Sequence, residues 1–422
     1  MSDEQSLPTG LQLTALDPVF REHPHDYLDR LRAEDPVHLD AALGRLFLTR
    51  LEDMKAVLAD RSLSVDPRKA PDTPRRRAMM GDVPPEAFQP SMLQLDDPDH
   101  KRLRGLVSQA FNQRSADAWR PRIREIADAL LDALAGRDLF DVIAEYASPL
   151  PIVVIAEMLG VDPGDMPQFK RWSDARAHLF NPARTSEQAE ALTAAGQGLQ
   201  DYFAHAIDAR RGRAGADLIS LLVDAEEAGD RLSAREIVST CNLLLVAGNL
   251  TTTDLIGNGV LALLRCPDQL AKLCALPEVV PNAVEEMLRY DPPVAQAGRF
   301  ALEPLQIGGS EVQPGQAMTC SLLAAGHDPA RHSEPHRFDI ERADTTHLAL
   351  AAARITAWAP RSPARRRRSR LQRCSSVSLG CVSTRSIPLS TSAHRSSMDW
   401  RRFGCAPPDA LRGGSGSEKR RS

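Results

Sequence analysis

LLLVAGNLTTTDLIGN, residues 243–258, is the stretch that decides the fold. Its apolar first half is typical of a helix buried in the core of a large helical protein. Gly248 and Thr251 favour a second interpretation, because glycine weakens the helical hydrogen-bond ladder and a threonine hydroxyl can bond to the carbonyl one turn earlier. The stretch therefore predicts a long central helix, which either only packs or also opens locally beside Ala247 and Gly248.

A second helix is expected over DDPDHKRLRGLVSQAF, residues 96–111, where acidic residues favour the N-terminal end. His100 and Arg104 lie four residues apart and therefore share one face of this helix. With Lys101 and Arg102 beside them, they could form only a solvated surface pair. As a cationic pair they could instead bind carboxylates through charge-assisted hydrogen bonds.

Two further charged segments lie nearer the C-terminus. AVEEMLRYDPPV, residues 283–294, carries Glu286 and Arg289 in a Glu-x-x-Arg pattern, and PHRFDIER, residues 335–342, carries Arg337. Together with the two preceding stretches, and in this order, they resemble the cytochrome P450 family in its soluble bacterial form. The resemblance extends from about residue 15 to residue 349.

The resemblance implies a mainly α fold with a small β region, built as a single large helical domain. Local patterns agree with it: residues 117–134 and 189–211 place apolar side chains at the spacing of amphipathic helices. Residues 36–49 and 305–319 read as short strands punctuated by glycine and proline. We expect residues 1–350 to form this domain, truncated in its C-terminal haem-binding part.

An activity and its partners also follow from the resemblance. The family implies a haem-thiolate monooxygenase that inserts one oxygen atom of dioxygen into an organic substrate, with ferredoxin and ferredoxin reductase as redox partners. The segments that would form the substrate pocket, residues 79–93 and 175–198 with Val246 and Val294, are partly apolar or small. A small apolar substrate is therefore expected, although no particular class follows.

By resemblance, Thr251 is the catalytic residue and helps to deliver protons, a role normally shared with an adjacent acid. The family usually carries Glu or Asp where this chain has Leu250. Leucine cannot relay protons, so either Asp254, one helical turn further on, or ordered water reaching Asn249 would replace the acid.

The cofactor-binding residues follow in the same way. Ala247 and Gly248 would lie against the haem, while His100, Arg104 and Arg299 would bind its propionate carboxylates. Arg299 is expected in a strand after a Pro-Pro turn.

Glu286, Arg289 and Arg337 resemble a buried ion network that supports the fold beneath the haem. Their expected role is structural rather than catalytic.

The resemblance ends at Leu350, where the chain continues LAAARITAWAPRSPA, residues 350–364. The family would have a Phe-Gly loop ending in the cysteine whose thiolate binds iron and favours cleavage of the oxygen–oxygen bond. Cys374 lies too far downstream, without a glycine loop, and like Cys381 is expected to be an exposed thiol in a disordered tail. No metal ligand is therefore predicted in this chain.

A one-nucleotide loss explains this departure. A gene encoding FGGGAHYCLGAPLA, with suitable codons, reads LAAARITAWAPRSPA after one C is removed from the phenylalanine codon, and this matches residues 350–364. An out-of-frame origin therefore accounts for both the missing cysteine and the basic tail. We expect the chain as it stands to be inactive.

Residues 351–422 form a separate basic region, with sixteen basic and three acidic residues and a formal charge of +13, which leaves −17 on residues 1–350. The run of arginines at 365–368 and the Ser, Gly and Pro clusters around it cannot bury a core, so disorder is expected. A native basic arm that binds polyanions such as nucleic acid is the alternative, although no nucleic-acid partner is expected.

The composition favours a cytoplasmic protein. Of the 422 residues 42% are hydrophobic, which is enough for a large core. The start, MSDEQSLPTGLQLTALDPVF, holds no apolar stretch that could be a signal peptide or membrane anchor. The seven cysteines show no paired metal spacing and no secretory context, which argues against disulfides.

Two alternative functions stay open at this point. The first is a non-enzymatic apo scaffold that binds small molecules or, through its tail, polyanions. The second is a peroxide-dependent haem enzyme, which the absence of an acid at Leu250 suggests.

We predict that the chain, expressed as it stands, lacks the reduced carbon monoxide absorption of thiolate-ligated haem, because no cysteine lies between Cys320 and Cys374. A carbon monoxide difference spectrum measures this. A clear thiolate-type band would contradict the prediction, and Cys374→Ala and Cys381→Ala would then identify the recruited ligand. Resequencing the gene around codon 350 separates a real lesion from a reading error.

Overall fold

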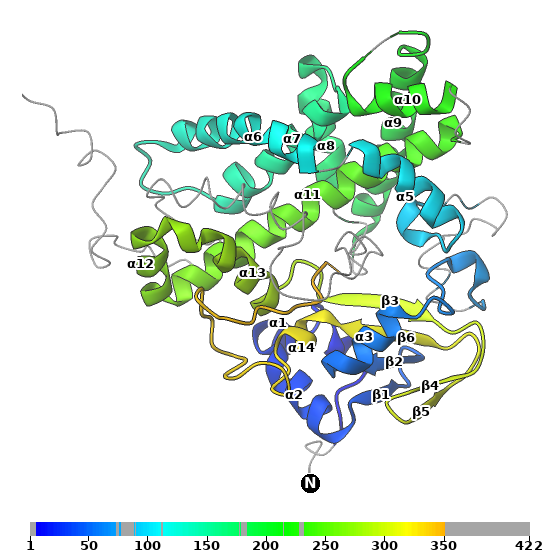
Figure 1. Cartoon of the computed structure of the whole chain (residues 1–422), viewed down its shortest axis with the longest axis vertical. Coiled ribbons are helices and arrows are strands. Elements are labelled where there is room, and N and C mark those ends of the chain that lie inside the picture. Colours follow the sequence, from blue (N-terminus) through cyan, green and yellow to red (C-terminus); the bar gives the residue numbers. More distant parts are fainter. Residues whose placement is uncertain are drawn as a thin grey trace, which may run out of the picture.

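The computed structural model describes residues 6–72, 76, 88, 90–110, 113–176, 178, 184–213, 215–227 and 232–350. The described chain is mainly helical with a small β region, which confirms the predicted fold class. Helices fill the upper part of Figure 1, and strands with a few short helices form the lower part. The predicted tail, residues 351–422, lies outside the described residues, as does most of the expected pocket segment 79–93.

The upper, helical part is organised around α11. Its helices are α5 (Asp99–Ala110), α6 (Gln113–Leu134), α7 (Pro149–Leu159), α8 (Met166–Arg176), α9 (Ser186–Asp208), α10 (Leu218–Glu227), α11 (Ala234–Arg265), α12 (Pro267–Ala275) and α13 (Val280–Tyr290). The predicted helices at residues 117–134 and 189–211 correspond to α6 and α9, and the helix expected from residue 96 begins as α5 at Asp99.

The ends of α11 are set by its sequence. Ser233 accepts a hydrogen bond from the Glu236 amide, and the Glu236 carboxylate accepts one from the Ser233 amide, so two otherwise unpaired N–H groups are satisfied. Pro267 follows the C-cap residue Cys266 and starts α12. Between these ends α11 runs for 32 residues and contacts α7, α8, α9 and α10.

Two hydrophobic clusters meet along α11. Leu255, Ile256 and Val260 belong to a cluster shared with α6 and α13, whereas Cys241 and Leu245 belong to one shared with α9 and α10. The helix is therefore the element through which both halves of the helical core are joined.

The lower part contains a four-stranded sheet of order β1–β2–β6–β3. Its strands are β1 (Val37–Asp40), β2 (Arg45–Leu48), β3 (Gln296–Phe300) and β6 (Ala317–Ser321). β2 pairs with β6 in parallel, and the other two pairings are antiparallel. A separate hairpin of β4 (Leu305–Ile307) and β5 (Ser310–Val312) turns through Gly308 and Gly309, both at positive φ. The strands predicted at residues 36–49 and 305–319 are thus confirmed.

Short helices pack around the sheet. They are α1 (Pro18–Glu22), α2 (Pro24–Glu34), α3 (Leu51–Ala59) and α14 (Leu322–Gly326). The remaining turns of helix are η1 (Gly10–Leu13), η2 (Pro67–Lys69), η3 (Met92–Gln94), η4 (Ile143–Ala147), η5 (Pro163–Asp165) and η7 (Pro277–Val279).

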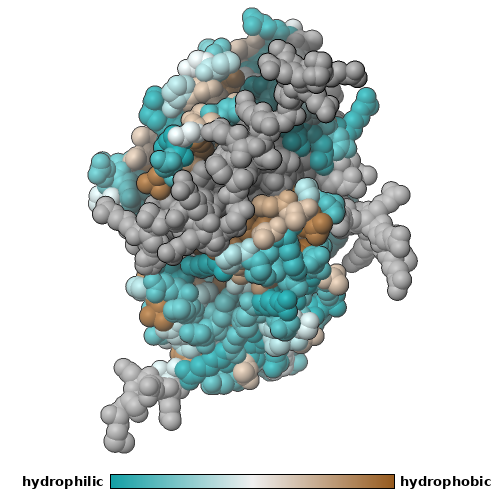
Figure 2. All heavy atoms as spheres, turned by 90° about the vertical axis from the view of Figure 1, so that its left-hand side faces the viewer, coloured by the Kyte–Doolittle hydropathy of each residue, from teal (hydrophilic) through white to brown (hydrophobic). Residues whose placement is uncertain are grey.

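Among the described residues, no helix is both long and apolar enough to cross a membrane. On the face shown in Figure 2 the described surface is mostly hydrophilic, with hydrophobic side chains gathered in small groups.

Candidate functional site

The predicted catalytic threonine lies near the middle of α11. The Thr251 hydroxyl donates a 2.6 Å hydrogen bond to the Ala247 carbonyl oxygen, which confirms the predicted bond to the preceding turn. Because an α-helix repeats every 3.6 residues, Ala247, Thr251, Asp254 and Asn258 share one face. This face holds the hydroxyl, a carboxyl and an amide within about three turns.

The predicted local opening of α11 is not present in the structure. The helix is continuous through Gly248. A carbonyl oxygen has two lone pairs, so that of Ala247 can accept the hydroxyl of Thr251 without giving up its place in the ladder. A Cβ atom added at Gly248 would lie 3.8 Å from Cγ1 of Ile155 on α7, an ordinary contact, so the glycine is not required by packing.

Asn249 ties α11 to α8. Its side chain is 2% exposed and donates a 2.7 Å hydrogen bond to the Ser173 hydroxyl, while its oxygen accepts a bond of 3.2 Å from the Thr253 hydroxyl. Both polar ends are occupied by protein partners. Of the two replacements considered for the acid at Leu250, this arrangement favours Asp254.

Two carboxyl groups with raised pKa values lie near this face: Asp254 on α11 itself and Asp291 at the end of α13. Desolvation by the atoms around it raises the pKa of Asp254 to about 6, although part of its side chain is exposed. Desolvation also raises the pKa of Asp291 to about 6, with Arg265 opposing the shift and Asp254 adding to it. The Asn258 side chain donates to the Asp291 carbonyl oxygen at 3.3 Å, which ties α11 to the end of α13. Carboxyls that titrate near neutral pH can both give and accept protons.

The expected propionate-binding residues lie on two segments joined by Ser64. The Ser64 hydroxyl donates to the carboxylate of Asp96, which lies three residues before the start of α5, the helix that carries His100. The backbone of Ser64 pairs with that of Phe300 through two hydrogen bonds of 3.0 and 3.1 Å, and Phe300 follows Arg299 in β3. His100 and Arg299, 199 residues apart in the sequence, are therefore carried on neighbouring segments.

These side chains, two arginines and a histidine, are shielded from water. His100 is 6% exposed and Arg299 3%. Desolvation lowers the pKa of Arg104, one turn along α5 from His100. The Arg299 guanidinium donates to the Gly298 carbonyl oxygen at 2.7 Å. A set of shielded cations suits an anionic ligand such as a carboxylate.

Glu286 and Arg289 form the buried pair that the sequence predicts. Two parallel hydrogen bonds of 2.7 and 2.8 Å join the guanidinium to the carboxylate, and both side chains are fully buried. Arg289 also donates to the carbonyl oxygens of Gly326 and Pro335. A Cβ at Gly326 would collide with the Arg289 carbonyl oxygen, so this contact requires glycine.

The second arginine of the network is Arg342, so the prediction of Arg337 is wrong for the side chain. Arg337 contributes only its carbonyl oxygen, which accepts from Arg289 at 3.2 Å, and its guanidinium is 55% exposed beside Glu334. Arg342 instead donates to the Glu286 carboxylate at 3.2 Å and is 10% exposed. The cause is the path of the loop, which turns Arg337 outward and Arg342 inward.

The expected haem fits these residues only in part. His100, Arg104 and Arg299 suit its carboxylates. Ala247 and Gly248 are half-buried and have small side chains, so a flat ring could lie close to the backbone of α11 there.

The described cysteines are Cys241, Cys266, Cys274 and Cys320. Burial raises the pKa of Cys241 and of Cys320 to about 12, so both are thiols at neutral pH, whereas iron requires a thiolate. The loop in which the iron ligand is expected falls in residues 351–364, outside the described residues.

Comparison with known proteins gives a consistent result. The cytochrome P450 family matches residues 276–348. Cytochrome P450 107B1 from Saccharopolyspora erythraea is 39% identical over 350 residues, covering 80% of this chain and 83% of that protein. Cytochrome P450 monooxygenase PikC from Streptomyces venezuelae is 40% identical over 350 residues, covering 81% of each chain. Ligand-free CYP164A2 from Mycobacterium smegmatis superposes with a TM-score of 0.75 and 37% identity, covering 88% of this chain and 91% of that one.

The two arginines provide a matched test of the ion network. We predict that Arg342→Ala lowers the free energy of unfolding by about 2 kcal/mol, because it removes a charge-assisted bond to the buried Glu286 carboxylate. Arg337→Ala removes an exposed pair with Glu334 and should cost less than about 1 kcal/mol. Urea unfolding measures both losses, because a shift in the midpoint at an unchanged dependence on urea concentration gives the change in the free energy of unfolding. Equal losses would contradict the assignment of Arg342.

Proposed function

The chain belongs to the cytochrome P450 family and is by family a monooxygenase, and on this premise we propose that the α11 face from Ala247 to Asn258 is its proton-handling site. The proposed reaction inserts one oxygen atom of dioxygen into an apolar organic molecule. The hydrogen bond from Thr251 to Ala247, with the Asp254 carboxyl one turn away on the same face, is the observation that supports the assignment most directly.

Haem, when bound, supplies the activation of dioxygen. The protein residues bind and orient it. We propose that His100, Arg104 and Arg299 hold its propionates, since burial of these cations is offset when carboxylates meet them.

The hydroxyl of Thr251 is oriented by its bond to Ala247. Because its hydrogen points to the Ala247 carbonyl, the lone pairs of its oxygen are left to accept a hydrogen bond from a water or a ligand. A water held in this way can give up a proton, and a neighbouring acid can then replace the proton that the water has lost. Asp254 suits this role because its pKa of about 6 keeps both protonation states populated near neutral pH. A peroxide route, which Leu250 suggested, is then not required.

For the substrate and the redox partners we propose only their chemical class. Val246 on α11 and Val294 after α13 are both half-buried and apolar, which supports a hydrophobic substrate. Electrons are proposed to come from a ferredoxin and its reductase. We further propose that the chain as it stands is inactive, since residues 350–364 hold no cysteine, and that a single lost nucleotide at codon 350 is the cause.

The experiment restores one nucleotide at codon 350 and compares variants of α11. We predict that the restored protein binds haem with a thiolate-type carbon monoxide spectrum. In it Thr251→Ala should lower the fraction of electrons that reach product by roughly tenfold or more, because the hydroxyl no longer guides protons. Product, hydrogen peroxide and consumed reductant are measured together, and peroxide should rise as product falls.

Thr252→Ala is the matched control, since Thr252 is the adjacent threonine on α11 and projects from another face. Its coupling should stay unchanged. Asp254→Asn should reduce coupling if Asp254 supplies the protons. Unchanged coupling in Thr251→Ala would show that another group delivers protons, and failure of the restored protein to bind haem would overturn the proposed function.

A further inference from the structure

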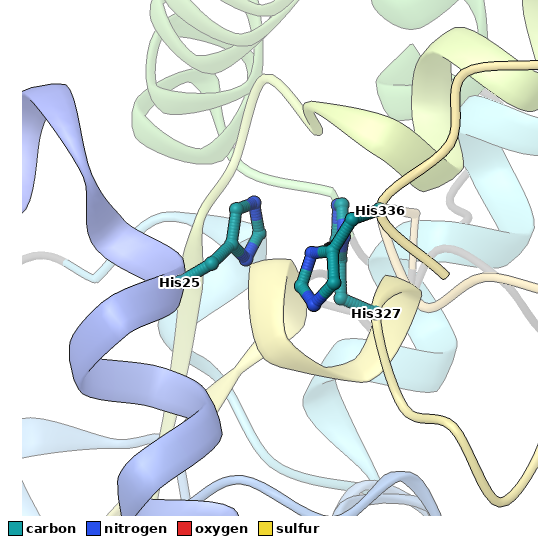
Figure 3. A group of neighbouring side chains, drawn as sticks. All are labelled: His25, His327 and His336. Atoms are coloured by element: carbon teal, nitrogen blue, oxygen red, sulfur yellow. Dashed lines mark hydrogen bonds between the residues drawn. The ribbon is translucent and has the colours of Figure 1, made fainter. Parts of the chain in front are cut away.

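Three histidines meet at a point in the lower part of the fold, beside α14. His25 lies in α2, His327 follows α14, and His336 lies in the segment leading to Phe338, as Figure 3 shows. Each histidine offers one ring nitrogen as a possible ligand atom, and these three nitrogens all lie within 4.8 Å of one another. Because His25 is about 300 residues from the other two, no spacing in the sequence indicates the cluster.

Hydrogen bonds orient two of the three rings. Nε2 of His327 lies 2.8 Å from the Tyr290 carbonyl oxygen, which can only accept, so this nitrogen carries the proton. Nε2 of His336 lies 2.7 Å from the Asp29 carboxylate, which favours a proton there too. In the neutral rings Nδ1 then holds the lone pair.

The two Nδ1 atoms face each other at 3.1 Å. Two lone pairs at this distance repel unless a cation lies between them. One solution is a proton on His336, which makes a hydrogen bond to His327. That solution does nothing for His25, whose buried Nδ1 has no hydrogen-bond partner among the described residues. A metal ion shared by the three rings satisfies all of them.

The distances suit such an ion. Two imidazole ligands of a tetrahedral zinc, each at 2.0–2.1 Å, are about 3.3 Å apart. The observed 3.1 Å between His327 and His336 is close to this value. The ring centroids of His25 and His336 lie 4.8 Å apart and those of His327 and His336 5.0 Å. The ring of His25 stacks on that of His327 at 3.9 Å, so it must swing away from this stack to bind the same ion.

The surroundings resemble those of a protein metal site. Metal-binding histidines usually donate their second N–H to a carboxylate or a backbone carbonyl, which fixes the ring. His336 has Asp29, and His327 has Tyr290. Asp29 is held in turn by Arg32 at 2.6 Å.

We propose that His25, His327 and His336 bind a divalent transition-metal ion, zinc being the best match in chemistry. Imidazole nitrogen suits zinc, copper and nickel, whereas calcium and magnesium prefer oxygen. The ion joins α2, the end of α14 and the segment that supplies Pro335 to Arg289. It is structural, and it is independent of haem and of the proposed reaction.

The test uses the full chain and Co²⁺ as a spectroscopic stand-in for zinc. We expect one Co²⁺ per chain with visible d–d absorption of tetrahedral type, displaced by Zn²⁺. His25→Gln and His336→Gln should each weaken binding by more than about 100-fold, and Asp29→Asn by roughly 10- to 100-fold. The unfolding temperature of the unaltered chain should rise with Zn²⁺, and that of His336→Gln should not.

His23→Gln is the matched control, because His23 is exposed and lies two residues from His25. It should bind Co²⁺ as the unaltered chain does. His25 and His336 are the residues to substitute, because His327 is fully buried and its replacement could unfold the protein. The circular dichroism spectra of the metal-free variants must match that of the unaltered chain. Absence of Co²⁺ absorption, or binding that survives both His25→Gln and His336→Gln as a cysteine site would, overturns the proposal.

Discussion

The buried pair of Glu286 and Arg289 is the interaction on which the lower part of the molecule depends. Two unit charges are removed from water there, so each must be fully paired. Arg289 meets this demand with three carbonyl oxygens from two other segments, that of Gly326 and those of Pro335 and Arg337. Glu286 accepts from the Asp339 amide as well. Satisfying one ion pair therefore fixes α13, the end of α14 and the loop of residues 333–342.

The position of α13 affects both the α11 face with Thr251 and the cluster of three histidines. The residues after Arg289 are held at the end of α13, where the Tyr290 carbonyl oxygen orients His327 and the Asp291 carbonyl oxygen accepts from α11. The face with Thr251 and the histidine cluster thus take their positions from the same helix end. A change that loosens α13 is expected to disturb both, although their chemistries are unrelated.

Sequence patterns predicted what depends on local periodicity and on ordered motifs: α6, α9, α11, the strands and the Thr251 bond. They did not separate Arg337 from Arg342, because the choice depends on how a loop without regular structure turns. They also missed Ser64, whose contacts join segments distant in the chain. The continuous helix at Gly248 shows that a residue able to weaken a ladder need not break one.

The parallel pairing of β2 with β6 has a consequence for synthesis. Arg45 pairs with Ala317, so β2 cannot pair with β6 until nearly the whole described chain has been synthesised. Until then one edge of β2 stays unpaired, and the clusters of Phe47 and Leu48 hold only their early members, such as Leu28 and Leu51. Contacts so distant in sequence form slowly. For most of its synthesis the nascent chain therefore exposes an unpaired strand edge, a surface that favours aggregation before folding is complete.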